Sequence, residues 1–72
     1  MKVSEQEFNF MTEGIAADLI QLLMDRKGYT LPQAVEEVYN SETYSALLRP
    51  ASGLYFQSAG YVYSLLEEEL TK

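Results

Sequence analysis

The sequence predicts an all-α fold, namely a compact bundle of three or four short helices with a long N-terminal helix. Apolar residues recur at spacings of three and four along most of the chain, which is the period of an α-helix. Three segments open with a serine or threonine that is suited to cap a helix. Seventy-two residues suffice for one hydrophobic core, so we expect a single helical domain over residues 1–72.

The first helix is expected to begin at about Glu5 or Glu7 and to end at Lys27. Acids early in this segment and bases at its end match the macrodipole of a helix, and Gly28 suits the left-handed conformation that ends one. Gly14 weakens the helix by about 1 kcal/mol relative to alanine. This glycine either permits close approach of another helix or marks the end of a loose N-terminal segment. The apolar stripe of the helix consists of Phe8, Met11, Ile15, Leu19, Leu22 and Leu23.

Two shorter helices are predicted next. Thr30 and Gln33 form a T-x-x-Q capping box in front of the second helix. Ser41 caps a third helix, expected over residues 42–48, which Pro50 ends because the residue before a proline avoids the helical region. The buried sides of these helices are expected to consist of Leu31, Ala34, Val35, Val38 and Tyr39, and of Tyr44, Leu47 and Leu48.

The last part of the chain predicts an extended segment and a fourth helix. Residues 54–56 are apolar, but no partner strand exists, so we expect an extended segment packed on the core. Ser58 caps a helix from about residue 59 to residue 71, with acids 67–69 on its solvated side. Three acids near a helix C-terminus oppose the macrodipole, so we expect its last turn to fray. The apolar stripe consists of Tyr61, Val62, Leu65, Leu66 and Leu70.

The composition removes most common catalytic and metal-binding arrangements. The chain has neither cysteine nor histidine, so it lacks the usual zinc ligands, the commonest general base and the base of a serine triad. Neighbouring acids at 36–37 and 67–69 point in different directions from one helix, whereas glycosidases need facing carboxylates. Neither a P-loop nor a calcium-loop spacing occurs. We therefore expect no enzyme activity, no catalytic residue, no cofactor and no metal.

The charge disfavours nucleic acid and membrane partners. Eleven acids and five bases give a net charge of -6, whereas duplex nucleic acids and anionic membranes are bound by lysine and arginine. The longest apolar stretch, residues 15–24, is interrupted and too short to span a bilayer, and the N-terminus lacks the apolar region of a signal peptide. We expect a cytoplasmic protein without membrane contact. A small helix-turn-helix DNA-binding regulator is the alternative, but Glu42 and the absence of a base before Arg49 disfavour it.

Six tyrosines and three phenylalanines favour a protein–protein interaction module. Tyr61 and Tyr63 lie on opposite sides of the fourth helix, and one small core rarely buries both. Because the chain is acidic, a basic protein is the expected partner. The alternative is that half-buried tyrosines rim the core, and a small-molecule site would need a larger pocket than this chain encloses alone. The predicted partner contacts, whose three aromatic side chains are expected to be exposed, are Tyr55, Phe56, Tyr63, Glu67, Glu68 and Glu69.

The first helix also predicts a homodimer. Its additional apolar residues widen the apolar arc to more than half of the circumference, which is typical of a helix covered on two sides. A second copy packed on this helix would cover the second side. The alternative is that the short helices wrap around it. These additional residues are Phe10, Ala16, Ala17, Ile20 and Met24.

The second half of the chain carries a recognisable motif. Residues 53–63 read GLYFQSAGYVY, preceded by Tyr39-Asn40-Ser41, Tyr44 and Leu47-Leu48. Over residues 15–70 the chain resembles a family of small uncharacterised bacterial helical proteins with a GLYxQSxxYVY-type motif. The resemblance implies a partner-binding, antitoxin-like role, because genes of this family are expected in toxin–antitoxin-like clusters. It implies no activity and transfers no functional residue.

Overall fold

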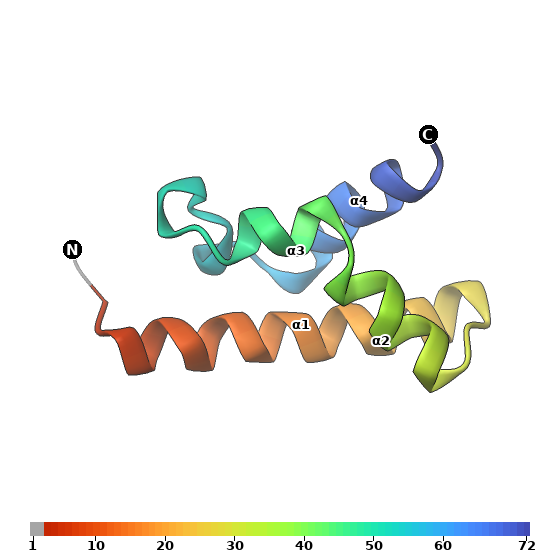
Figure 1. Cartoon of the computed structure of the whole chain (residues 1–72), viewed down its shortest axis with the longest axis horizontal. Coiled ribbons are helices and arrows are strands. Elements are labelled where there is room, and N and C mark those ends of the chain that lie inside the picture. Colours follow the sequence, from red (N-terminus) through yellow and green to blue (C-terminus); the bar gives the residue numbers. More distant parts are fainter. Residues whose placement is uncertain (1–2) are drawn as a thin grey trace.

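The computed structural model describes residues 3–72, and most of these residues are helical, with no strand among them. The predicted all-α bundle with a long N-terminal helix is therefore confirmed. The described chain measures 37 × 22 × 18 Å along its principal axes (Figure 1). The elements in chain order are α1 (Glu5–Lys27), α2 (Leu31–Tyr39), α3 (Glu42–Leu47), the 3-10 turns η1 (Pro50–Ser52) and η2 (Leu54–Phe56), and α4 (Ala59–Leu70).

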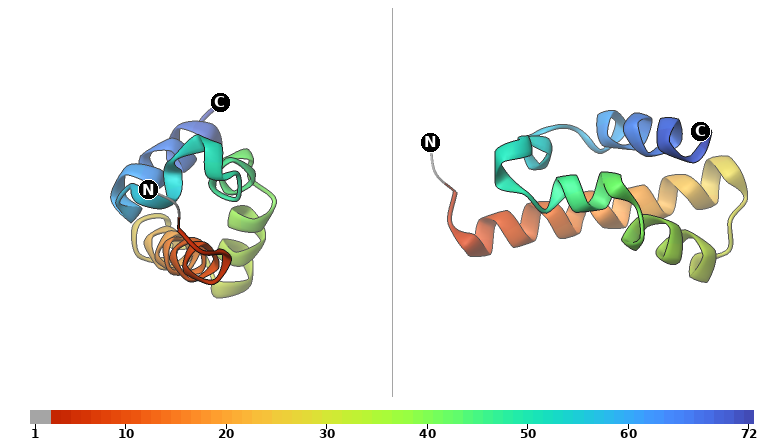
Figure 2. Two further views of the ribbon diagram at one scale, coloured as in Figure 1. Left: turned by 90° about the vertical axis from the view of Figure 1, so that its left-hand side faces the viewer. Right: turned by 45° about the horizontal axis from the view of Figure 1, so that its top comes forward.

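Helix α1 forms a base on which the shorter elements lie. Helix α2 folds back against the C-terminal part of α1, while α3 and the 3-10 turns run above its other half, and α4 closes the bundle against α1 and α3. The end-on view in Figure 2 shows the shorter elements gathered around part of the circumference of α1. One side of α1 is therefore left uncovered by the other described elements.

Helix α1 begins and ends as its local sequence predicts. The Ser4 hydroxyl accepts the Glu7 N–H, and the Glu7 carboxylate accepts the Ser4 N–H, at 3.1 and 3.0 Å. The N–H and then the hydroxyl of Ser4 hold the pKa of the Glu7 carboxyl below its ordinary value. Gly28, at φ 71°, ends the helix in the left-handed region.

The other helices also begin at their predicted caps. Thr30 and Gln33 form the reciprocal capping box of α2. The hydroxyl of Ser41 accepts the Tyr44 N–H at the start of α3, and the hydroxyl of Ser58 accepts the Tyr61 N–H at the start of α4. The helix starts predicted from the sequence are confirmed, because each of these caps depends only on residues three positions apart.

Each of the four α-helices contributes apolar side chains to the core, and α3 contributes Leu47 alone. Together these side chains join α1, α2, α3 and α4 into one apolar cluster, with Tyr55 of η2 at its edge. Their burial supplies most of the free energy that holds the bundle together. The core consists of Ile15, Ala16, Leu19, Leu23, Ala34, Val38, Leu47, Tyr55, Val62, Tyr63 and Leu66.

Several predicted positions differ in detail. Residues 54–56 form a 3-10 turn, so the expected extended segment is wrong. Gly53 lies at φ 71°, and its carbonyl accepts the Phe56 N–H, which closes the turn and carries Tyr55 into the core. Leu48, expected to be buried, is 43% exposed because it follows the last residue of α3. Leu31, Tyr39 and Tyr61, which were also expected on the apolar sides of their helices, are exposed as well.

None of the helices in residues 3–72 combines the length and the apolar character needed to cross a membrane.

Candidate functional site

The three aromatic residues predicted to contact a partner have different environments. Phe56 is 56% exposed, but Tyr55 and Tyr63 are only 9% and 2% exposed, so the expectation that all three are exposed is wrong. Tyr55 packs edge-on against Phe8, with 4.9 Å between ring centroids. The Tyr63 ring lies under the guanidinium of Arg26, at 5.2 Å from its centroid. In this conformation Phe56 is the member of the trio whose ring a partner can reach.

The three acids predicted to contact a partner also have different environments. Glu67 forms an ion pair with Lys27, at 3.3 Å between Nζ and Oε2. Glu69 binds the N-terminus of α3, and Glu68 is exposed. Because a carboxylate engaged within the fold is less available to a partner, Glu68 is the predicted acid best placed for an external contact.

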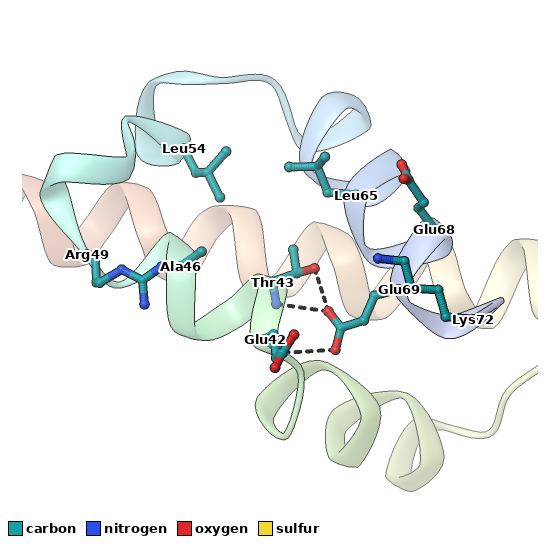
Figure 3. Close-up of a pocket in the computed structure, with 9 residues that line it drawn as sticks. All are labelled: Glu42, Thr43, Ala46, Arg49, Leu54, Leu65, Glu68, Glu69 and Lys72. Atoms are coloured by element: carbon teal, nitrogen blue, oxygen red, sulfur yellow. Dashed lines mark hydrogen bonds between the residues drawn. The ribbon is translucent and has the colours of Figure 1, made fainter.

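Glu69 joins the end of α4 to the start of α3 (Figure 3). Its Oε2 accepts the Glu42 N–H at 2.9 Å, and its Oε1 accepts the Thr43 N–H at 2.9 Å and the Thr43 hydroxyl at 2.7 Å. The anion occupies the positive end of the α3 dipole. The expectation of a freely solvated acid on a frayed last turn is therefore wrong at Glu69, because these bonds tie that turn to α3.

The pKa of Glu69 reflects two opposing effects. Partial burial disfavours the carboxylate and raises the pKa. The hydrogen bonds from Thr43 and from the Glu42 N–H favour the carboxylate, and together with Lys72 they outweigh burial, so the pKa lies below its ordinary value. Glu69 is thus ionised at neutral pH and acts as a structural acceptor.

An open pocket of about 370 Å³ surrounds Glu69, between α3 and α4. Its rim mixes acids with bases, so the pocket has no strong charge of one sign, and Glu69 already accepts three hydrogen bonds from α3. Within residues 3–72 no group of three acids is arranged to hold a metal ion. The pocket is lined by Glu42, Thr43, Ala46, Arg49, Leu54, Leu65, Glu68, Glu69 and Lys72 (Figure 3).

A second hollow lies between the N-terminal half of α1 and the segment around η2. We call it the α1–η2 groove; its volume is about 330 Å³. Phe10 and Phe56 are the exposed large apolar side chains of its lining, at 79% and 56%. The groove combines apolar lining with one carboxylate, that of Asp18. Its lining residues are Phe10, Met11, Gly14, Ile15, Asp18, Tyr55, Phe56, Gln57 and Ala59.

Sequence reasoning did not place Phe10 and Phe56 on one surface. The two residues are far apart in the chain, and η2 meets α1 only in the folded bundle. Gly14 was the sequence feature that could have indicated this surface. A glycine in the interior of a helix lowers its stability and usually serves packing or binding. The prediction of Tyr55 and Phe56 as contact residues did fall on this groove, which both of them line.

Tyr63 carries a buried hydroxyl that has no hydrogen-bond partner among the described residues. Leaving a buried hydroxyl unpaired costs about 1–3 kcal/mol. We expect Tyr63→Phe to raise the free energy of unfolding by about 1 kcal/mol, because phenylalanine keeps the ring under Arg26 and removes the unpaired group. Urea denaturation measures this change, with Tyr61→Phe as an exposed control that stays within about 0.5 kcal/mol. A clear loss of stability in Tyr63→Phe would contradict the prediction.

Comparisons of the chain with protein-family models, with curated proteins and with solved structures found no match. The resemblance to small bacterial helical proteins therefore stays a prediction that rests on the motif of residues 53–63.

Proposed function

We propose that this protein is a non-enzymatic interaction module that binds a basic partner protein. The observation that carries the proposal is the surplus of unpaired negative charge on its surface beside the exposed aromatic side chains of the α1–η2 groove. Eight of the eleven acids are exposed, and such a surface attracts and orients a basic partner. The exposed acids are Glu5, Glu7, Glu13, Asp18, Asp25, Glu36, Glu42 and Glu68.

The bases of the described chain do little to offset this surplus. Arg26 lies over the Tyr63 ring and Lys27 pairs with Glu67. Arg49 and Lys72 line the other pocket, between α3 and α4. Lys2 lies outside the described residues.

The helix-turn-helix alternative is disfavoured by the charge around α3. In such a regulator the second helix of the motif lies in the major groove of DNA, and its N-terminal residues contact the edges of the bases. Here the N-terminus of α3 is occupied by the Glu69 carboxylate, and Glu42 is exposed beside it. Two carboxylates at this position would repel the DNA backbone. Protein binding is therefore the better supported proposal.

The proposal includes a homodimer through α1 and a cytoplasmic location. Phe10 and Ala17 are exposed on α1, whereas Ala16 is buried and Ile20 and Met24 are half-buried against the core. The short helices thus cover part of the apolar arc that suggested the dimer, and the exposed part supports self-association along α1. An antitoxin-like role is proposed from the motif resemblance, and it is compatible with the same acidic character.

Capture of a partner from the cells that make the protein, followed by titration of the purified components, tests the proposal. We expect the captured protein to be basic and its affinity to fall at least about tenfold between roughly 0.05 M and 0.5 M salt, because salt screens exposed charges. Light-scattering mass of the protein alone, across a concentration series, gives the oligomeric state. A partner without basic character, or binding that is insensitive to salt, would contradict the proposal, and a monomer at all concentrations would remove the dimer.

A further inference from the structure

We infer that the α1–η2 groove is the docking site for a basic amphipathic helix of the partner protein. This inference rests on the proposed function and deepens it by naming the surface and the chemistry of its occupant. Three independent features of the groove carry it: exposed aromatic walls, an unfilled position at Gly14, and a row of carboxylates along α1.

The aromatic walls are unusual for a chain of this size. Phe10 is 79% exposed and Phe56 is 56% exposed, and both line the same groove, with Met11 and Ile15 also along it. Contiguous apolar surface that a monomer leaves in water marks an interaction site more often than isolated exposed residues do. An apolar side chain inserted between the two phenylalanines would remove both rings from water.

Gly14 has no role within the fold that explains its presence. It lies in the interior of α1, its φ is not positive, and a Cβ added there would meet nothing within 4 Å in the described chain. Alanine would therefore fit and would strengthen the helix. What the glycine does provide is space, because it lines the groove and lets another backbone approach α1 closely.

The charges on α1 identify the occupant as basic. Asp18 lies eleven residues after Glu7, and Asp25 lies seven residues after Asp18, spacings that keep all three on one side of a helix. Gly14 is seven residues after Glu7 and belongs to the same side. The groove side of α1 thus presents three exposed carboxylates, and that of Glu7 also accepts the Ser4 N–H through Oε1. Asp18 alone of the three lines the groove itself, and no base is among the described residues that line it.

A helix suits this surface because α1 is itself a long helix with an exposed side. A helix lying along α1 would place one large apolar side chain beside Gly14, between Phe10 and Phe56. That apolar side chain is the anchor of the docked helix. A base four residues to one side of the anchor would then face Asp18, and a base eleven residues to that side would face Asp25. A base seven residues to the other side would face Glu7. A second copy of this chain is a poorer occupant of the groove, since its net charge of -6 would add repulsion at these carboxylates. The proposed homodimer is therefore assigned to the side of α1 that carries Ala17, which does not line the groove.

A designed peptide with this pattern is the probe. It is an alanine-rich helix with one tryptophan and with lysines at the three spacings given above, and a second peptide carries the pattern in reverse order. Chemical-shift mapping on the isotope-labelled protein is expected to show the largest changes at Phe10, Gly14, Asp18 and Phe56. Peptides with tryptophan replaced by alanine, or with the lysines replaced by glutamate, are expected to bind at least about tenfold more weakly.

Gly14→Leu separates docking from folding. We expect this variant to melt at or above the wild-type temperature, because leucine favours the helix and meets no obstacle at Cβ, yet to bind the peptide at least about tenfold more weakly because it fills the groove. Phe56→Ala is expected to lose binding similarly. Tyr61→Ala is the matched control, since Tyr61 is 50% exposed but does not line the groove, and its affinity is expected to stay unchanged.

The results of these experiments test the docking site separately from the proposed function. Shifts centred outside the groove, unchanged binding by Gly14→Leu, or no binding by either peptide at millimolar concentration would each overturn the docking site. Concentration-dependent shifts in the groove without peptide would show a second copy there and would also overturn it. The proposed function is tested separately on the captured partner, and salt-sensitive binding of a basic protein would stand even if the groove were not its site.

Discussion

Leu19→Ala is expected to leave the protein close to unfolding at room temperature. Leu19 is fully buried near the middle of α1, the helix against which α2 and α4 both pack. Replacing a fully buried leucine by alanine costs about 3 kcal/mol, through lost burial and the cavity left behind. A core in a chain of this length rarely supplies more than about 3–5 kcal/mol. The absence of cysteine means that no disulfide adds to this core.

Urea denaturation followed by far-ultraviolet circular dichroism measures the loss. Leu31→Ala is the matched control, because the same substitution at a side chain that is 55% exposed is expected to change the free energy of unfolding by less than about 0.5 kcal/mol. Equal effects of the two substitutions would contradict the packing of α1 described above.

The helix starts could be predicted because the information is local. Thr30 meets Gln33, and Ser41 and Ser58 meet N–H groups three residues ahead, so each cap is readable from a short window of sequence. The end of α1 at Gly28 is equally local. The turn at residues 54–56 was predicted less well, since an apolar tripeptide does not by itself specify an extended or a 3-10 backbone.

The burial of the tyrosines could be predicted only in part. The positions of Tyr61 and Tyr63 on opposite sides of α4 indicated that one core would not bury both, and this is confirmed, but the exposed residue is Tyr61, which was expected in the apolar stripe. The helical period does not say which of the two faces the core, however. That choice depends on how α4 packs on α1, where Arg26 lies over the ring of Tyr63. The expectation that Tyr63 is exposed was wrong for this reason.

The motif of residues 53–63 has a structural explanation at several positions. Gly53 supplies the positive φ before η2, Ser58 caps α4, and Tyr55, Val62 and Tyr63 enter the core. These residues therefore specify the fold, and a motif of this kind can be shared by proteins that bind different partners.

The features of the candidate site depend on contacts between distant parts of the chain. Glu69 reaches Thr43 across 26 residues, and Phe10 and Phe56 meet at the groove only when η2 packs on α1. Neighbouring residues in the sequence contain no sign of either contact. Composition predicted an acidic surface, but only the fold separates the acids engaged within the protein from those exposed to a partner.

Glu69→Gln is expected to lower the free energy of unfolding by about 1.5 kcal/mol at neutral pH. The carboxylate accepts three hydrogen bonds at the start of α3, and charge-assisted bonds of this kind are stronger than neutral ones, although partial exposure to solvent reduces their contribution. Glutamine replaces one acceptor oxygen by an amide nitrogen that cannot accept the Glu42 or Thr43 N–H. Glu68→Gln is the matched control, because Glu68 is exposed, and its change is expected to stay below about 0.5 kcal/mol.

We also expect the loss of stability caused by Glu69→Gln to depend on pH. The folded-state pKa of Glu69 lies below the ordinary value of 4.5, so the unfolded chain takes up this proton first as the pH falls. The stabilisation is complete above the ordinary pKa and is lost as the pH falls through the lower folded-state value. The difference between wild type and Glu69→Gln, measured by urea denaturation, is therefore expected to be constant from pH 7 to about pH 5.5 and to shrink below the ordinary pKa. A difference that stays constant down to about pH 3 would show that the bonds of Glu69 do not require its charge.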